Sequence, residues 1–324
     1  MRFICRMKNF ISVILLLTIL VIPYKTVSAD CVKYNQKDIV VGLLSTEFVS
    51  YPNEYKTAKE ITQLLQGYGV RVILMDYNVI MKLARDEIVK ANETYEKSYK
   101  ISRYDIIESV VARFIEQNNI SRILIPGNYY NISSLPIAPS SHRQLITNAV
   151  VKVISKNQCI HLLGICGGLQ GIMHANGIEI TRVENMITSH PTVKSHVISM
   201  PNPRNVDANL HKIIISPGSR LSNIIGNLNN GLSKKQVVYF PDAHSEAINN
   251  HIENITKMYN LGYKIIALSE DGIIEGIEDK YGNIHLQFHP EYLMINGKEK
   301  SDGTDRNVSL LIADAIIKDF LFRD

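Results

Sequence analysis

A cysteine enclosed by glycines is the first feature of the chain that could do chemistry. The segment Gly164-Ile165-Cys166-Gly167-Gly168 has the form of a nucleophile elbow, a sharp strand-to-helix turn that leaves room only for small residues beside the reactive side chain. The N-terminus of the following helix would stabilise a thiolate, and the N–H of Gly167 would face a developing oxyanion. Taken alone, the pentapeptide fits equally well a glycine-rich turn that contains a cysteine by chance.

A histidine and a glutamate near the C-terminus supply the partners that such a cysteine needs. The segment IHLQFHPEY, residues 284–292, alternates apolar and polar side chains, which is typical of a strand with one buried face. His289 stands at the end of this strand, and Glu291 can turn back to its ring. A cysteine nucleophile requires a base, and the base requires a carboxylate that fixes its tautomer. We therefore predict a catalytic triad of Cys166, His289 and Glu291.

An α/β fold must position these residues. Short β-branched apolar runs alternate with segments of helical periodicity, and uninterrupted apolar runs suit parallel strands that are covered on both faces. This alternation predicts a doubly wound, mostly parallel sheet. The expected strands cover residues 38–44, 70–76, 121–127 and 159–166, and the expected helices cover 53–69, 104–119 and 143–157.

The second half of the sequence is richer in strands. Residues 77–100 are expected to form a partly helical excursion, and a solvated surface helix is a better interpretation of them than a lid. No Pro-, Gly- or Ser-rich linker interrupts the chain, so residues 30–324 are expected to form a single domain. Strands are expected within 212–216, 236–240, 263–269, 272–279 and 283–289, with a hairpin turn at 280–282 and a closing helix over 308–321.

The first 29 residues have the pattern of a secretory signal peptide. Basic residues precede an apolar run over residues 11–22, and small residues precede a cleavage site after Ala29. We expect export to the periplasm or the extracellular space, and an uncleaved membrane anchor over residues 11–22 is the alternative. The segment holds four basic residues and no acidic one, so the formal charge of +4 belongs to it and the rest of the chain is neutral. A neutral mature chain gives no electrostatic case for nucleic-acid binding.

Three cysteines, Cys31, Cys159 and Cys166, would remain after this cleavage. An odd number in an oxidising compartment leaves at least one thiol free. Cys31 and Cys159 each precede an expected strand and could form a disulfide; three unpaired thiols are the alternative. Asp30, directly before Cys31, argues against lipid attachment at that cysteine. No zinc-type ligand cluster is evident, so neither a metal nor an organic cofactor is expected, and the question of a homodimer stays open.

The two chemical motifs together resemble a known family. The motifs GICGGLQ (164–170) and QFHPEY (287–292) resemble those of the class I glutamine amidotransferases, and this resemblance implies a flavodoxin-like fold. Within that group the chain is most similar to the γ-glutamyl-γ-aminobutyrate hydrolase family of cysteine peptidases. The resemblance extends from Ile39 to Phe320. Further family-like stretches follow in the family's order at 211–226, 240–250 and 265–278.

The resemblance implies a cysteine-dependent hydrolase that cleaves a γ-glutamyl amide bond through a thioester intermediate and needs no cofactor. It makes Cys166 the nucleophile, His289 the general base and acid, and Glu291 the orienting carboxylate. Two backbone N–H groups would hold the oxyanion, and two side chains would lie near the glutamyl end of the substrate. Carried over residue by residue, these oxyanion and substrate-binding positions fall on Gly127, Asn128, Gly167, Gln170 and His244.

Four positions depart from the family pattern. Asn128 stands where the family's Pro-Gly-Gly-x-Asp loop has its second glycine, and Gly167 stands where arginine is common. If the oxyanion loop needs a positive φ, asparagine tolerates it less well than glycine. Asp242 and Glu246 replace a serine and a glutamine, and acids near the pocket would disfavour a substrate carboxylate unless a cation compensates. We expect retained chemistry with a changed substrate preference.

Two alternatives to the hydrolase stay open. One is a glutaminase-type amidotransferase domain that serves a partner protein, although export argues against it because the usual acceptor enzymes are cytosolic. The other is a non-catalytic binding protein that has kept the fold, which Asn128 and the altered acids suggest. For the hydrolase itself we expect a small-molecule γ-glutamyl substrate, no nucleic acid, no metal, and a membrane only if the signal segment is uncleaved.

Overall fold

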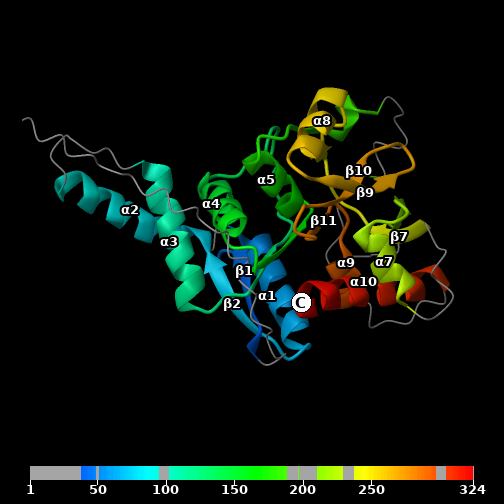
Figure 1. Cartoon of the computed structure of the whole chain (residues 1–324), viewed down its shortest axis with the longest axis horizontal. Coiled ribbons are helices and arrows are strands. Elements are labelled where there is room, and N and C mark those ends of the chain that lie inside the picture. Colours follow the sequence, from blue (N-terminus) through cyan, green and yellow to red (C-terminus); the bar gives the residue numbers. More distant parts are fainter. Residues whose placement is uncertain are drawn as a thin grey trace, which may run out of the picture. The chain divides into compact units, whose positions relative to one another are not determined.

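A nine-stranded sheet runs through the described part of the chain (Figure 1). The structure is a computed structural model that describes residues 38–48, 51–94, 102–187, 196, 210–228, 237–296 and 304–323. The strand order is β2-β1-β3-β4-β11-β10-β9-β6-β7. The first five strands in this order, from β2 to β11, are parallel to one another. Each of the last four, β10, β9, β6 and β7, is antiparallel to the strand before it in the order. The predicted doubly wound α/β fold with a β-rich C-terminal half is confirmed.

The parallel part of the sheet has the flavodoxin-like order 2-1-3-4, extended by the C-terminal strand β11. Strands β1, β3 and β4 are buried along their whole length, as their uninterrupted apolar runs predict. The strands are β1 (Val40–Ser45), β2 (Arg71–Asp76), β3 (Arg122–Ile125), β4 (His161–Ile165) and β11 (Ile284–Leu286). Their helices are α1 (Pro52–Gln66), α2 (Tyr77–Thr94), α3 (Arg103–Gln117), α4 (His142–Lys156) and α5 (Gly167–Ala175).

The antiparallel part of the sheet begins at the β10–β11 hairpin. Its turn contains Gly282 with φ +77°, which confirms the expected hairpin at 280–282. The strands are β10 (Ile274–Glu278), β9 (Lys264–Ser269), β6 (Leu210–Ile215) and β7 (Val237–Pro241), and a separate ribbon pairs β5 (Ile180–Arg182) with β8 (Glu246–Ile248). The remaining helices are η2 (Val183–Asn185), α7 (Arg220–Gly226), α8 (Ile252–Asn260), α9 (Pro290–Asn296) and α10 (Thr304–Phe322).

Helices cover both faces of the parallel strands (Figure 1). Successive side chains of a strand point to opposite faces. Accordingly, Val41 and Leu43 of β1 belong to one core, which also contains residues of α1, α7 and α10. Val40 and Leu44 belong to the other core, with residues of α2, α3 and α4. Both faces of the central strands are therefore dry, and the ends of the strands are left for chemistry.

The structure corrects two element predictions and adds two strands. Helix α2 is not merely a solvated surface helix, since its Tyr77, Ile80, Met81 and Ala84 are buried. The strand expected at 283–289 ends at Leu286, because the chain leaves the sheet before α9. Strands β5 and β8 are three residues long, too short to give a clear periodicity, and were not predicted.

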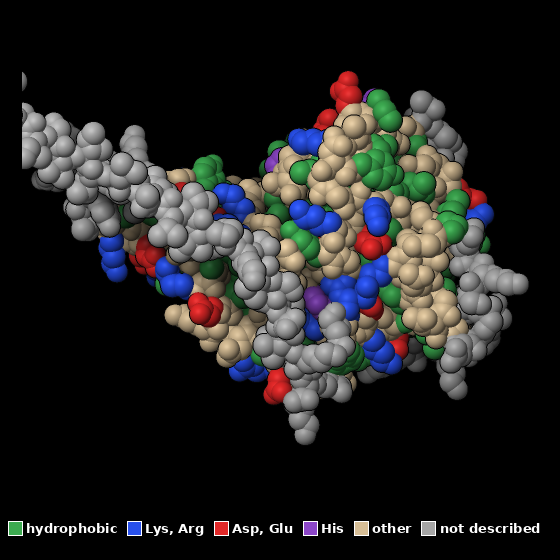
Figure 2. Space-filling view, in the orientation of Figure 1, with side chains coloured by type: hydrophobic (Ala, Val, Ile, Leu, Met, Phe, Trp, Pro, Cys, Tyr) green, Lys and Arg blue, Asp and Glu red, His purple; other side chains and the backbone are tan. Residues whose placement is uncertain are grey.

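Several expectations concern residues beyond the described ranges. The signal segment and the alternative anchor over residues 11–22 lie outside them, and none of the described helices has the length and apolar character needed to span a bilayer. Cys159 is disulfide-bonded, whereas Cys166 is free. Cys31, its expected partner, lies outside the described residues, so that pairing stays a prediction. Positive and negative side chains are interspersed on the face shown in Figure 2, in keeping with the neutral balance expected for the mature chain.

Candidate active site

The glycine-enclosed cysteine lies on a sharp turn between β4 and α5. Cys166 alone connects the two elements and has φ 50° and ψ −109°, and Asn119 is the other described non-glycine residue with a positive φ. This backbone conformation is unfavourable for a residue with a Cβ. The N–H of Cys166 donates to the carbonyl of Leu286 at 2.7 Å, which ties the turn to β11. Strand, strained cysteine and helix form the geometry of a nucleophile elbow.

Each flanking glycine faces atoms that a side chain would strike. A Cβ on Gly164 would lie 2.6 Å from Cδ1 of Ile172. A Cβ on Gly168 would lie 1.9 Å from the carbonyl oxygen of Ile125, a backbone atom that cannot rotate away. The glycines therefore allow β3 and α5 to close on the cysteine, and the sequence pattern has a steric cause.

His289 and Glu291 form a buried pair beside this turn. Nδ1 of His289 lies 2.7 Å from Oε1 of Glu291, and the residues are 3% and 1% exposed. The N–H of His289 donates to the carbonyl of Pro241 at 2.9 Å, and its ring stacks on Tyr292 with a centroid distance of 4.2 Å. Glu291 lies in the first turn of α9, where the helix dipole favours a carboxylate. Both the position and the orientation of the imidazole are thus fixed.

Cys166 lies beside His289 and contributes to the pKa of its imidazole. Burial would lower the pKa of His289, but the charge of Glu291, followed by contributions from Tyr292 and Cys166, raises this pKa well above its usual range. A Cβ on Gly127 would lie 2.8 Å from Cε1 of His289 and 3.4 Å from Cβ of Cys166. The loop after β3 therefore passes directly beside the pair. The structure brings Cys166, His289 and Glu291 together, with Gly127 next to them.

Asn128 and Gly167, the two predicted oxyanion positions, are neighbours in space. A Cβ on Gly167 would lie 3.2 Å from the backbone nitrogen of Asn128 and 2.1 Å from its Oδ1. The asparagine side chain fills the space that a side chain at position 167 would need. Asn128 and Gly167, the two departures from the family pattern, are therefore sterically linked, because the side chain of one occupies the space that a side chain at the other would need. Asn128 does not have a positive φ, so the expected conflict between asparagine and a left-handed backbone does not arise.

Gln170 and Glu246 are committed to contacts within the protein. Nε2 of Gln170 donates to the carbonyl oxygen of Glu246 at 2.6 Å and to Oε1 of Gln287 at 3.2 Å. The buried Glu246 carboxylate accepts the N–H of Ile132 at 2.7 Å, and the N–H and Oγ of Ser133 at 3.0 and 2.6 Å. Because these donors compensate Glu246, it does not present the free negative charge to a substrate that the sequence suggested.

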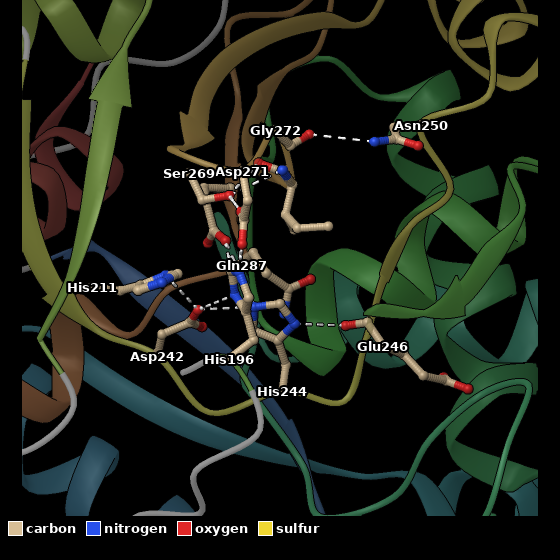
Figure 3. Close-up of polar contacts among 12 residues, drawn as sticks. His196, His211, Asp242, His244, Glu246, Asn250, Ser269, Asp271, Gly272 and Gln287 are labelled. Atoms are coloured by element: carbon tan, nitrogen blue, oxygen red, sulfur yellow. Dashed lines mark hydrogen bonds and ion pairs between the residues drawn. The ribbon is translucent and has the colours of Figure 1, made fainter. Parts of the chain in front are cut away.

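His244 lies in a group of histidines and carboxylates that the sequence analysis did not find (Figure 3). At its centre, Oδ2 of Asp242 lies 2.9 Å from Nδ1 of His196, 3.0 Å from Nε2 of His244 and 3.2 Å from Nδ1 of His211. Three imidazoles thus supply the compensation that the acid at position 242 requires. We call the group the histidine–carboxylate cluster; it comprises His196, His211, Asp242, His244, Asp271 and Glu275.

No zinc-type ligand cluster was found from the sequence, whereas four residues of the histidine–carboxylate cluster are of the types that can hold a metal ion. The members of the cluster are spread over 80 positions of the chain, from His196 to Glu275, and no pair has a recognisable ligand spacing apart from Asp242 and His244. Only the convergence of the β7–β8 connection, β10 and His196 brings them together. Four of these residues offer ligand atoms that all lie within 4.8 Å of one another.

The sheet and the cysteine site have the arrangement expected from the resemblance of the sequence to the class I glutamine amidotransferases. The family model of Peptidase C26 matches residues 126–291, which is half of the chain and extends from the loop after β3 to Glu291. The chain therefore belongs to the Peptidase C26 family, and it is a cysteine-type amide hydrolase or amidotransferase. No curated protein sequence matches it.

Solved structures show weak overall similarity. A glutamine amidotransferase from Thermotoga maritima is 10% identical with a TM-score of 0.48, and the match covers 88% of this chain and 98% of that chain. A glutamine amidotransferase from Methylobacillus flagellatus is 12% identical with a TM-score of 0.43, and the match covers 89% and 96% of the two chains.

Proposed function

We propose that the protein hydrolyses γ-glutamyl amides with Cys166 as the nucleophile. The observation that carries the proposal is the buried arrangement in which a cysteine with strained backbone lies beside an imidazole that Glu291 holds at 2.7 Å. The family's hydrolase motifs at 211–226 and 240–250 favour a γ-glutamyl substrate over other amides. The nucleophile, base and orienting carboxylate are Cys166, His289 and Glu291.

The reaction would proceed in two steps. Nδ1 of His289 faces Glu291, which leaves Nε2 to take the thiol proton. The Cys166 sulfur attacks the γ-carbonyl carbon, and the backbone N–H groups of Asn128 and Gly167 hold the oxyanion. The imidazolium protonates the leaving amine as the C–N bond breaks, giving a thioester. Water then loses a proton to His289 and attacks the thioester, and the sulfur departs to restore the thiol.

Export of the enzyme is part of the proposal. The signal-peptide pattern of residues 1–29 supports it. The disulfide at Cys159 also supports it, because disulfides persist mainly in oxidising compartments. An exported hydrolase would meet free γ-glutamyl peptides or γ-glutamyl links in cell-wall fragments.

A hydrolysis screen tests the function directly. The purified chain is incubated with γ-glutamyl amines and peptides, and with the α-linked isomer of each as a matched control, and amine release is measured. We expect turnover of γ-linked compounds only, and a loss of about 10⁴-fold or more in Cys166→Ser at an unchanged melting temperature. Cleavage of α- and γ-linked isomers alike would contradict the γ-glutamyl assignment.

Two other results would identify the alternative functions. Ammonia release from glutamine that rises on addition of a partner protein would indicate an amidotransferase domain. No turnover, combined with a Cys166 that reacts with a thiol probe as slowly in the native chain as in His289→Ala, would indicate a binding protein.

A further inference from the structure

The histidine–carboxylate cluster contains four completely or almost completely buried potential ligands. His196, Asp242 and Glu275 are 0% exposed and His244 is 5% exposed. They come from separate parts of the fold: His196 follows η2, Asp242 and His244 lie between β7 and β8, and Glu275 lies in β10. Two carboxylates and two histidines are buried together here, and burying a charge is expensive unless it is compensated.

The distances between these ligand atoms fit a four-coordinate ion. Oδ2 of Asp242 lies 2.9 Å from Nδ1 of His196 and 3.0 Å from Nε2 of His244. Oε1 of Glu275 lies 3.7 Å from each of the same two nitrogens. A tetrahedral zinc ion with bonds of about 2.0–2.1 Å has ligand–ligand edges of about 3.3 Å. These four of the six ligand–ligand distances lie on both sides of that value, and all six are within 4.8 Å.

The outer ring nitrogens are also held as in a metal site. Nδ1 of His244 lies 2.9 Å from the carbonyl oxygen of Glu246, which fixes it as a donor and leaves Nε2 for a metal. Nε2 of His196 lies 3.1 Å from Asp271, which leaves Nδ1 (Figure 3). Metal-binding histidines generally donate their second N–H to a carbonyl or carboxylate in this way. Both imidazoles therefore direct the correct nitrogen into the cluster.

Glu275 is an independent indication of a ligand. Its side chain is completely buried, and neither carboxylate oxygen accepts a hydrogen bond from the described residues. Each such oxygen normally finds a partner, and leaving a buried polar group unsatisfied costs about 1–3 kcal/mol or more. Nδ1 of His196 and Nε2 of His244, which also face Asp242, each lie 3.7 Å from Oε1 of Glu275. A cation among the four residues would satisfy Glu275 and both histidines at once.

We propose that His196, Asp242, His244 and Glu275 bind one Zn²⁺ ion as a structural site separate from the catalytic triad. The donors are imidazole nitrogens and carboxylate oxygens, a set that suits zinc and related divalent transition metals. Four protein ligands close the coordination sphere, so the ion would not activate a substrate or water. It would tie His196 to β10 and to the connection between β7 and β8.

A metal-free cluster is the competing arrangement. In it, two protonated histidines would balance the acids: burial lowers the pKa of His196, but hydrogen bonds to Asp242 and Asp271 outweigh burial and raise it to about 9. In that arrangement the described histidine partners of Glu275 lie 3.7 Å from its Oε1. A zinc site predicts stoichiometric metal binding, and the protonated network predicts none.

Zinc titration of the full chain tests the proposal. The chain is stripped of metal with a chelator and titrated with Zn²⁺ by calorimetry, and metal content is measured after gel filtration. We expect one ion per chain and a higher melting temperature in its presence. Because Cys166 and His289 could also bind zinc, the titration is repeated in Cys166→Ser, where the site should persist. Co²⁺ should give a tetrahedral spectrum without thiolate-to-metal charge transfer.

Matched variants locate the ion. Glu275→Gln should weaken Zn²⁺ binding at least a hundredfold, whereas Glu270→Gln, an exposed acid near the same strand, should not change it. Asp271→Leu removes the acceptor that orients His196 and should weaken binding by about 10–100-fold. If Glu275→Gln does not fold without metal, the wild-type titration still decides. The proposal is overturned if the stripped chain binds no zinc, or if binding disappears in Cys166→Ser and persists in Glu275→Gln.

Discussion

The triad and the histidine–carboxylate cluster both place imidazoles against buried carboxylates, yet they are built for different tasks. In the triad, one histidine meets one carboxylate at 2.7 Å on Nδ1, and its other side faces a thiol. In the cluster, one carboxylate oxygen faces three histidines, and the outer nitrogens of two of them are also held. The first arrangement leaves a nitrogen that can exchange a proton with a reactant. The second engages both nitrogens of His196 and both nitrogens of His244.

Backbone geometry separates the two regions further. Cys166 has a positive φ at the junction of β4 and α5, and glycines around it remove every Cβ that would block the turn. No described residue of the cluster has a positive φ. Strain of this kind costs roughly 1–3 kcal/mol and persists where function requires it. A histidine–carboxylate contact therefore does not by itself indicate catalysis; a strained nucleophile beside it does.

Replacing one histidine from each region should give the largest difference. His289→Gln removes the base and acid of the proposed reaction and should lower kcat by about 10²–10⁴-fold. His211→Gln removes a histidine that contacts Asp242 and is not a proposed metal ligand, so kcat should change only a few-fold. Amine release at saturating substrate measures both, with melting temperatures as the folding control. Equal losses would show that the cluster takes part in turnover and would break the comparison.

Glu291→Gln should have a smaller effect on rate and a distinct effect on pH dependence. The loss in kcat should be less than in His289→Gln, because the carboxylate orients the imidazole and transfers no proton. The Glu291 charge raises the pKa of His289, so activity that needs the imidazolium is lost only as pH rises through this raised value. In Glu291→Gln the pKa of His289 should be lower, so the fall in activity with rising pH should begin at a lower pH. A profile of kcat/KM against pH measures the shift, and an unchanged alkaline limb would contradict the role of Glu291.

Local sequence patterns predicted the triad because each of its parts lies on one short segment. The glycines around Cys166 have steric reasons that any such turn would share, and His289 and Glu291 are two residues apart. The parallel strands could also be predicted from the sequence, because burial on both faces requires uninterrupted apolar runs. The hairpin at 280–282 needed only a turn signal between two strands.

The cluster could not be predicted, because it depends on how distant segments meet. His196 and Glu275 become neighbours only through the packing around β10, and no spacing rule relates them. Glu246 was expected near the substrate, but the backbone N–H groups of Ile132 and Ser133 donate hydrogen bonds to its carboxylate and compensate its charge. Helix α2 was interpreted as solvated because its charges are evident in sequence, whereas the core that buries its apolar stripe is formed by α3 and α4.

A glycine outside the cysteine turn provides a control for the steric argument. Gly168→Ala places a Cβ 1.9 Å from the carbonyl oxygen of Ile125 and should lower the free energy of unfolding by about 1–3 kcal/mol or more. Gly226→Ala, at the end of α7, meets nothing within 4 Å and should be neutral or slightly stabilising. Urea unfolding measures both. If the two variants have equal stability, the glycines of the turn are not required sterically.

The steric link between Asn128 and Gly167 gives the finest test. Gly167→Ala alone should lower stability and kcat/KM, because the new Cβ would lie 2.1 Å from Oδ1 of Asn128. Asn128→Gly alone should have little effect, since position 128 does not need a positive φ. The double variant should regain much of the lost stability and kcat/KM, because Asn128→Gly removes the side chain that the new Cβ at position 167 would strike. A double-mutant cycle should give a coupling of about 0.5–3 kcal/mol. Additive effects would mean that the side chain of Asn128 moves aside freely, and then the two departures from the family pattern would be unrelated.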